Sequence, residues 1–228
     1  MINAQKDNTI FLNMALKNNY TMMKSILLLG ATGLVGTECL RQAIADDRIS
    51  HITVLSRSLL SVHHHKITEV ITPLEEMEKY PGAFSADAVV CALGTTINKA
   101  GSQEVFRKVD FEFPLRAATI AHAQGAKHFL LVSALGANSR SSVFYNRVKG
   151  ETEDAVIKIP FNCITIVRPS LLLGDRKEFR LGERIAQLFS PFIPAPYAPV
   201  HARAVGARLI SSLFESRTGI AIIESKQI

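Results

Sequence analysis

The chain has 228 residues, of which 47% are hydrophobic and 20% charged, a composition typical of a folded domain that excludes a disordered protein. Its formal net charge of +6 is scattered, without a basic stripe or arm, so we expect an anionic small ligand and no nucleic acid. Cys39, Cys91 and Cys163 each fall in an apolar segment, which indicates buried, reduced thiols in a cytoplasmic protein. No apolar run approaches the roughly 18 residues that a membrane span needs.

Residues 1–23 differ in character from the rest of the chain. They are rich in asparagine, and their short apolar patch, IFLNMAL, lacks the basic start and the small-residue cleavage site of a secretory signal. We interpret this segment as a disordered leader or as a stretch ahead of the true start; a weak targeting or docking helix is the alternative. Residues 24–228 then form the predicted domain.

From residue 24 onward, predicted strands and helices alternate. Strands are predicted at 25–29, 52–55, 67–71, 88–93, 128–134, 162–167 and 219–223. Helices are predicted up to residue 45, over 102–124 with a kink at Pro114, from 144 onward, and over 201–216 after a proline-rich loop at 190–200. Short, fully apolar strands separated by helices predict a doubly wound α/β fold, in which a mostly parallel sheet is covered on both faces.

A glycine-rich turn, GATGLVG, follows the first predicted strand and opens the first helix. Gly30 would allow the tight turn, Gly33 the approach of a pyrophosphate, and Gly36 the packing of helix against strand. The start of the helix would offer N–H groups and a positive dipole end to the phosphates. A purely structural turn is the alternative, but the position of this loop favours a dinucleotide site in a single Rossmann domain.

The end of the second strand, LSRS, bears on the choice of dinucleotide. An NAD site would place an acidic residue here to hold the ribose 2′-hydroxyl, and none is present. Arg57, flanked by Ser56 and Ser58, could instead make charge-assisted hydrogen bonds to a 2′-phosphate. An exposed arginine without a ligand is the alternative. We therefore predict NADP(H) in preference to NAD(H), with Leu93, Gly94 and Thr95 of the fourth strand end against its adenosine and phosphate side.

Three further residues could supply the chemistry of a nicotinamide site. Tyr145 and Lys149 are four apart and so share one face of a helix. Tyr145 would exchange a proton with a carbonyl or alcohol oxygen, while the Lys149 ammonium would favour the phenolate and hold the nicotinamide ribose. Ser133, at the end of the fifth strand, would hydrogen-bond the substrate oxygen. The alternative is two amphipathic side chains at the edge of an apolar stripe.

Several of these segments together resemble a known family. GATGLVG, LSR, ALGTT, the segment KHFLLVSALGANSRSSVFYNRVKGE and VRPSLLLGDRKEFR resemble the atypical short-chain dehydrogenase/reductases over roughly residues 24–228, in particular a small NADPH-binding group of Tat-interacting oxidoreductase-like proteins. The resemblance implies that Tyr145 and Lys149 are the catalytic pair. Implied cofactor contacts come from Thr32, Gly33, Leu34, Val35, Arg57, Leu93, Gly94, Leu172 and Arg180, with Pro169 near the carboxamide. Many members complete a proton relay with an asparagine where this chain has Asp110, so that relay is not carried over.

These features together predict an NADP(H)-dependent oxidoreductase that acts on a small carbonyl or alcohol compound. An NADPH-binding regulator or redox sensor with little or no turnover is the alternative. We expect the residues after Arg180 to build the substrate pocket and the protein to be a monomer or a homodimer. The run HHH at 63–65 is interpreted as a polar turn, since consecutive residues point to different sides and no matching ligand cluster accompanies them, so no metal is expected.

Overall fold

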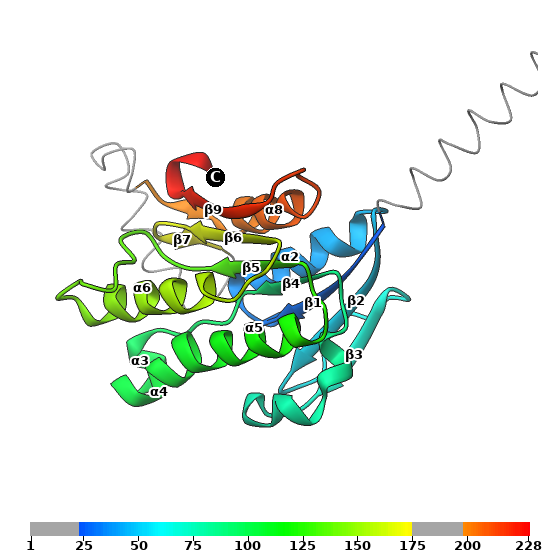
Figure 1. The fold of residues 1–228 in the computed structure, drawn as a ribbon, viewed down its shortest axis with the longest axis horizontal. Helices are drawn as coiled ribbons and strands as arrows, with labels where there is room; N and C mark the ends of the chain where they lie inside the picture. Colours follow the sequence, from blue (N-terminus) through cyan, green and yellow to red (C-terminus); the bar gives the residue numbers. More distant parts are fainter. Residues whose placement is uncertain (1–22, 175–197) are drawn as a thin grey trace, which may run out of the picture.

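The computed structural model describes residues 23–174 and 198–228, which are built around a seven-stranded sheet (Figure 1). Its strand order is β3-β2-β1-β4-β5-β6-β9, and every neighbouring pair is parallel. The strands are β1 (Lys24–Leu29), β2 (Ile49–Ser56), β3 (Ile67–Ile71), β4 (Ala88–Cys91), β5 (His128–Val132), β6 (Cys163–Arg168) and β9 (Gly219–Glu224). The order reverses between β1 and β4, the switch point at which such sheets bind ligands. The predicted doubly wound fold is confirmed.

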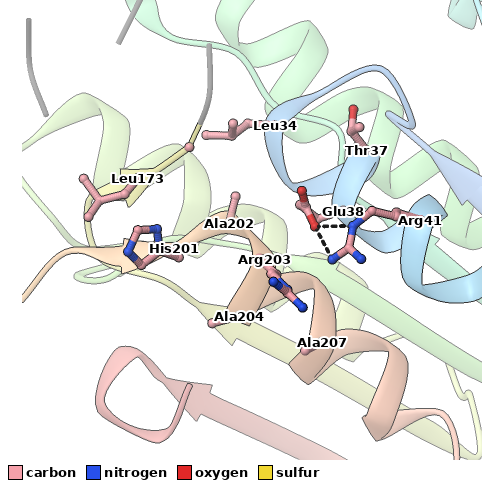
Figure 2. A pocket seen from close by; sticks show the side chains of 11 residues that line it. Leu34, Thr37, Glu38, Arg41, Leu173, His201, Ala202, Arg203, Ala204 and Ala207 are labelled. Carbon is pink, nitrogen blue, oxygen red and sulfur yellow. Dashed lines mark hydrogen bonds and ion pairs between the residues drawn. The ribbon is translucent and has the colours of Figure 1, made fainter. Parts of the chain in front are cut away.

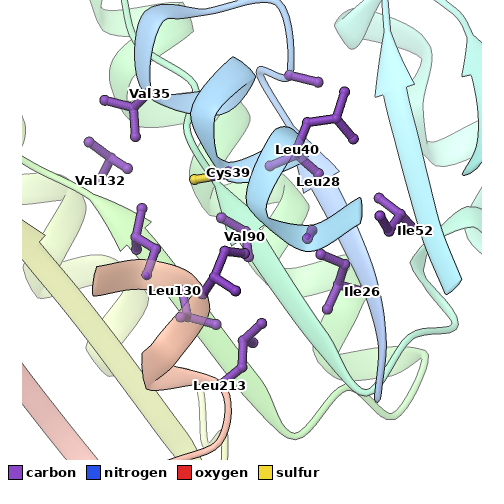
Figure 3. Close-up of a cluster of buried hydrophobic side chains, with 14 of the residues drawn as sticks. Ile26, Leu28, Val35, Cys39, Leu40, Ile52, Val90, Leu130, Val132 and Leu213 are labelled. Carbon is purple, nitrogen blue, oxygen red and sulfur yellow. The ribbon is translucent and has the colours of Figure 1, made fainter. Parts of the chain in front are cut away.

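Both faces of the sheet are covered, as the apolar strands require. In β1, Ile26 and Leu28 point into one core cluster while Leu27 and Leu29 point into the other. The first cluster lies under helices α2 (Leu34–Ala45) and α8 (Ala202–Ser212), and Figure 3 shows Cys39 and Leu40 of α2 among its members. The second lies under helices α5 (Phe113–Ala123) and α6 (Phe144–Ile157). A strand that is buried on both faces therefore appears in the sequence as a continuous run of apolar residues.

The long helix predicted at 102–124 is present without a break from Gln103 to Ala123, but it changes type along its length. After α3 (Ile97–Ala100) come α4 (Gln103–Arg107), a π-helical turn η3 (Lys108–Glu112) and α5. Pro114 has no N–H and so cannot donate to the carbonyl of Asp110 four residues earlier. The Thr152 hydroxyl of α6 lies 2.8 Å from that carbonyl and also 2.8 Å from the carbonyl of Val148 in its own helix, so the two carbonyls share one hydroxyl donor. The predicted kink is therefore a change of helix type just before the proline.

The smaller elements complete the described chain. They are the 3₁₀ turns η1 (Leu74–Lys79), η2 (Pro81–Phe84) and η6 (Ser225–Gln227), and a two-stranded sheet of β7 (Leu172–Leu173) and β8 (Val200–His201). Among the described residues, the three cysteines are buried and unbridged, no side-chain cluster is suited to a metal ion, and no helix is long and apolar enough to span a bilayer. Residues 1–22 of the predicted leader, residues 190–197 of the proline-rich loop, Arg180 and the part of the expected substrate pocket between Arg180 and residue 197 lie outside the described ranges.

Candidate cofactor and active site

The glycine loop brings three chain segments to within contact distance at the switch point. Gly30 has a φ of +79°, and a Cβ on it would lie 2.5 Å from the carbonyl oxygen of Ala92 after β4. A Cβ on Gly36 would lie 2.0 Å from the carbonyl oxygen of Gly30. With any residue other than glycine at position 36, α2 could not start this close to β1. The first N–H groups of α2 have no partner within the helix and are available to an anion. The loop therefore has the geometry of a phosphate-binding turn.

A cleft of about 570 Å³ opens beside this loop. Eight residues predicted to contact the cofactor line it: Gly30, Thr32, Gly33, Ser56, Arg57, Leu93, Gly94 and Thr95. The Arg57 side chain is exposed and forms no ion pair with another described residue, whereas Lys108 on the same cleft pairs with Glu75 at 2.8 Å. An uncompensated positive charge thus stands at the end of β2, where a dinucleotide would place its adenosine ribose.

Lys149 lies directly behind the part of this cleft formed by Gly94. A Cβ built on Gly94 would be 3.7 Å from the Lys149 amine and 3.4 Å from an oxygen of Asp110. The amine lies 2.7 Å from that same Asp110 oxygen, and the other carboxylate oxygen accepts a 2.8 Å hydrogen bond from the backbone N–H of Thr95. Burial lowers the pKa of Lys149, but the Asp110 carboxylate and Tyr145 more than offset this effect, so the pKa lies above its ordinary value.

Tyr145 lies in the first turn of α6, partly buried, and interacts electrostatically with Lys149 one turn later. The ring of Phe106, which is fully buried, lies 5.5 Å from the Tyr145 ring and 5.6 Å from that of Phe144. These tilted aromatic contacts fix the start of α6 against α4. The structure thus places Tyr145 and Lys149 together near the phosphate loop end of the sheet.

Ser133 is placed differently from its prediction. It is 5% exposed, and its hydroxyl donates to the carboxylate of Glu153, which is itself buried in α6. Glu153 also pairs with Arg168 at the end of β6, with 3.0 Å between Nε and the carboxylate, and Arg168 reaches Glu224 of β9 at 2.9 Å. The Ser133 hydroxyl therefore belongs to a buried network of hydrogen bonds and ion pairs. An ionised carboxylate such as that of Glu153 is a stronger hydrogen-bond acceptor than a neutral oxygen.

Other predicted cofactor residues do not line the cleft. Val35 is 5% exposed and its side chain packs into the core, so it could reach a ligand only through its backbone. The carbonyl of Pro169 accepts a 2.8 Å bond from the N–H of Leu135, and Leu172 lies in β7, partly packed on the core. Leu34 faces a second cavity.

This second cavity, of about 870 Å³, is lined by residues of α2 and of α8 (Figure 2), two helices that pack against each other around Gly206. Its charged residues include Glu38 and Arg41, which form an ion pair of 2.8 Å along α2. It is larger than the first cleft but includes neither the glycines of the loop nor the ends of β2 and β4. The lining residues are Leu34, Thr37, Glu38, Arg41, Leu173, Gly174, His201, Ala202, Arg203, Ala204 and Ala207. We therefore place the dinucleotide in the smaller cleft.

Sequence reasoning missed two groups of residues at this site. Leu74, Glu75 and Lys108 line the cleft, although they belong to short turns with no recognisable motif. The sequence marks Asp110 only as an aspartate where many family members have an asparagine. In the structure it is 1% exposed and in contact with Lys149. The spacing of Asp110 and Pro114 was the available signal, since a proline frees the carbonyl four residues before it.

Known proteins resemble this chain in sequence and in fold. A family model described as NAD(P)H-binding matches residues 30–190. Protein HTATIP2 of Rattus norvegicus is 33% identical over 222 residues, covering 93% of this chain and 91% of the relative, and the mitochondrial protein FMP52 of Candida albicans is 39% identical over 171 residues, covering 72% and 74%. The predicted likeness to the Tat-interacting group is confirmed. Several relatives are named as mitochondrial proteins, so the predicted cytoplasmic location is wrong.

Solved structures extend the likeness of fold to enzymes with low sequence identity. The Bordetella bronchiseptica enzyme WbmG, solved in complex with NAD, superposes with a TM-score of 0.68 at 13% identity, covering 89% of this chain and 73% of that one. UDP-glucose 4-epimerase of Thermotoga maritima gives 0.66 at 14% identity, covering 88% and 76%. At such identities the likeness concerns the fold alone.

Proposed function

Because the chain belongs to the NAD(P)H-binding family, we propose that it is an NADP(H)-dependent oxidoreductase that moves hydride to or from a small carbonyl or alcohol compound. The observation that supports this proposal is that the Lys149 amine lies behind Gly94 on the wall of the cleft that the glycine loop lines, with Tyr145 one turn earlier on the same helix. Gly94 connects the cleft with this lysine. It lines the cleft, and a Cβ at its position would lie in contact with the Lys149 amine. The cofactor would supply the hydride chemistry when bound.

The residues of the chain would divide the remaining work. The N–H groups at the start of α2 would hold the pyrophosphate, and Arg57 would bind the 2′-phosphate that distinguishes NADP from NAD. Lys149 would hold the nicotinamide ribose and, as an ammonium, would favour the phenolate form of Tyr145. Tyr145 would then give a proton to the substrate oxygen during reduction or take one during oxidation.

Replacing the tyrosine hydroxyl tests this assignment. A Tyr145→Phe variant should lose about 10²–10⁴-fold in kcat/KM for NADPH-dependent reduction of any active compound in a panel of aldehydes and ketones, because proton transfer contributes that much. Its affinity for NADPH, measured by fluorescence titration, should stay within about twofold of the parent, since the ring remains. Tyr80→Phe, at an exposed tyrosine outside the cleft, is the matched control. Full turnover by Tyr145→Phe would remove Tyr145 from the mechanism.

A second function, NADPH-dependent regulation without turnover, is favoured by one observation. The Ser133 hydroxyl, which would polarise the substrate oxygen, is bonded to Glu153. The two functions separate in one comparison of the unmodified protein. A sensor would bind NADPH and gain thermal stability while reducing no compound of the panel, and an enzyme would show both binding and turnover.

A further inference from the structure

Asp110 connects three elements around Lys149. One carboxylate oxygen lies 2.7 Å from the Lys149 amine on α6, and the other accepts from the N–H of Thr95, which lines the cleft. Its backbone carbonyl accepts from Thr152, one turn after Lys149 on the same helix. The carboxylate is completely buried and the lysine side chain is 8% exposed. Asp110 thus ties the cleft wall to the helix that carries the proposed catalytic pair.

The contacts of Asp110 serve a different purpose from the proton relay in which many family members use an asparagine at this position. A buried carboxylate is costly unless an opposite charge and hydrogen bonds compensate it. The ammonium compensates one carboxylate oxygen by charge, without a hydrogen bond of good geometry, and one backbone N–H donates to the other oxygen. Its position is set by the π-helical turn and by Pro114, which leave the Asp110 carbonyl open to Thr152.

We propose that Asp110 is the positioning residue of this site, a fixed counter-ion that keeps Lys149 charged and holds its amine behind Gly94 and Thr95. The proposal rests on the proposed function in one respect only, which is that Lys149 contacts the nucleotide in the cleft. It assigns to the aspartate a role in the charge state of the lysine that an asparagine could not perform.

Other titratable groups face Lys149 from the elements packed around it. In the described chain they are Tyr145 from α6 and Cys91 from β4, besides Asp110 from η3. Burial raises the pKa of the Cys91 thiol to about 12, so it is neutral at physiological pH. Of these three groups, Asp110 forms the ion pair with the Lys149 amine, at 2.7 Å.

The charge state of Lys149 can be measured directly in the full chain without nucleotide. In protein labelled with ¹³C-lysine, the Lys149 side-chain resonance, assigned with Lys149→Arg, should titrate in the unmodified protein above the ordinary midpoint of 10.5. In Asp110→Asn, which keeps the shape and an acceptor for Thr95, the midpoint should fall by at least about one pH unit. Asp154→Asn, an exposed carboxylate on the same helix, is the control and should cause no shift.

Two further measurements separate charge from structure. Asp110→Glu, which retains the charge, should keep the midpoint within about half a unit of the parent. Thr152→Val, which removes the hydroxyl bond to the Asp110 carbonyl but not the carboxylate, should lower thermal stability and leave the midpoint in place. An unchanged midpoint in Asp110→Asn overturns the proposal. If that variant fails to fold, a midpoint at or below 10.5 in the unmodified protein does the same. None of these readouts depends on turnover, so a failure of the proposed reaction is seen separately.

Discussion

In the proposed function, the preference for NADP(H) over NAD(H) rests on one side chain, Arg57. Replacing it with glutamine removes the charge and nearly keeps the length. The guanidinium is exposed and forms no ion pair within the described part of the chain, so its loss should leave folding intact and act on binding alone. A hydrogen bond to a charged group contributes about 1.5–3 kcal/mol, and solvent screening at this exposed position favours the lower part of that range. About 1.5–2 kcal/mol corresponds to NADPH binding about 10- to 30-fold weaker.

The assay is fluorescence titration of the unmodified protein and Arg57→Gln with NADPH and NADH at two salt concentrations. NADH affinity should change by less than about twofold, because NADH lacks the 2′-phosphate. The difference between the two proteins should shrink at high salt. Arg203→Gln, which removes the same charge from the lining of the larger cavity, is the control and should change neither affinity. An equal loss for both nucleotides, or tighter binding of NADH by the unmodified protein, would refute the argument.

Two further predictions concern stability. Burial lowers the pKa of His128 to about 4; because the unfolded chain binds the proton near pH 6.5, the free energy of unfolding should fall by about 3 kcal/mol as the pH drops through this interval. Urea unfolding at several pH values checks this, and a His128→Gln variant with the same pH dependence would contradict it. Glu153→Gln should lower the free energy of unfolding by about 3 kcal/mol, since breaking a buried ion pair costs about 3–5 kcal/mol and Arg168 keeps its contact with Glu224. Glu78→Gln, in an exposed pair, should cost less than about 1 kcal/mol, and equal effects of the two substitutions would exclude a special role for the buried network.

The sheet could be predicted from sequence because its strands carry a local signal. A continuous apolar run such as that of β1 fits a strand buried on both faces, and the glycine loop marks its end. The boundaries were less accurate: β5 ends at Val132 and α8 at Ser212, both earlier than predicted. Ends of elements depend on which partner satisfies the last backbone groups, and sequence patterns do not record that partner.

At the site, position was predictable and partners were not. The ends of β2 and β4 placed Arg57 and Gly94 on the cleft because parallel strands end at the same edge. The contact of Ser133 with Glu153 could not be anticipated, since the two residues are 20 apart and meet only when α6 packs on β5. The same holds for Lys149 and Asp110, whose pairing depends on a helical turn of unusual type.

The bond from Thr152 to the backbone of Asp110 has a consequence for how this site tolerates change. It joins α6 to the main chain of η3, and a change of rotamer at residue 110 leaves that carbonyl in place. Side-chain substitutions at Asp110 therefore alter the charge next to Lys149 without sliding the helix. Inserting or deleting a single residue between Asp110 and Pro114 would instead change the direction of the Asp110 carbonyl and so remove its bond with Thr152.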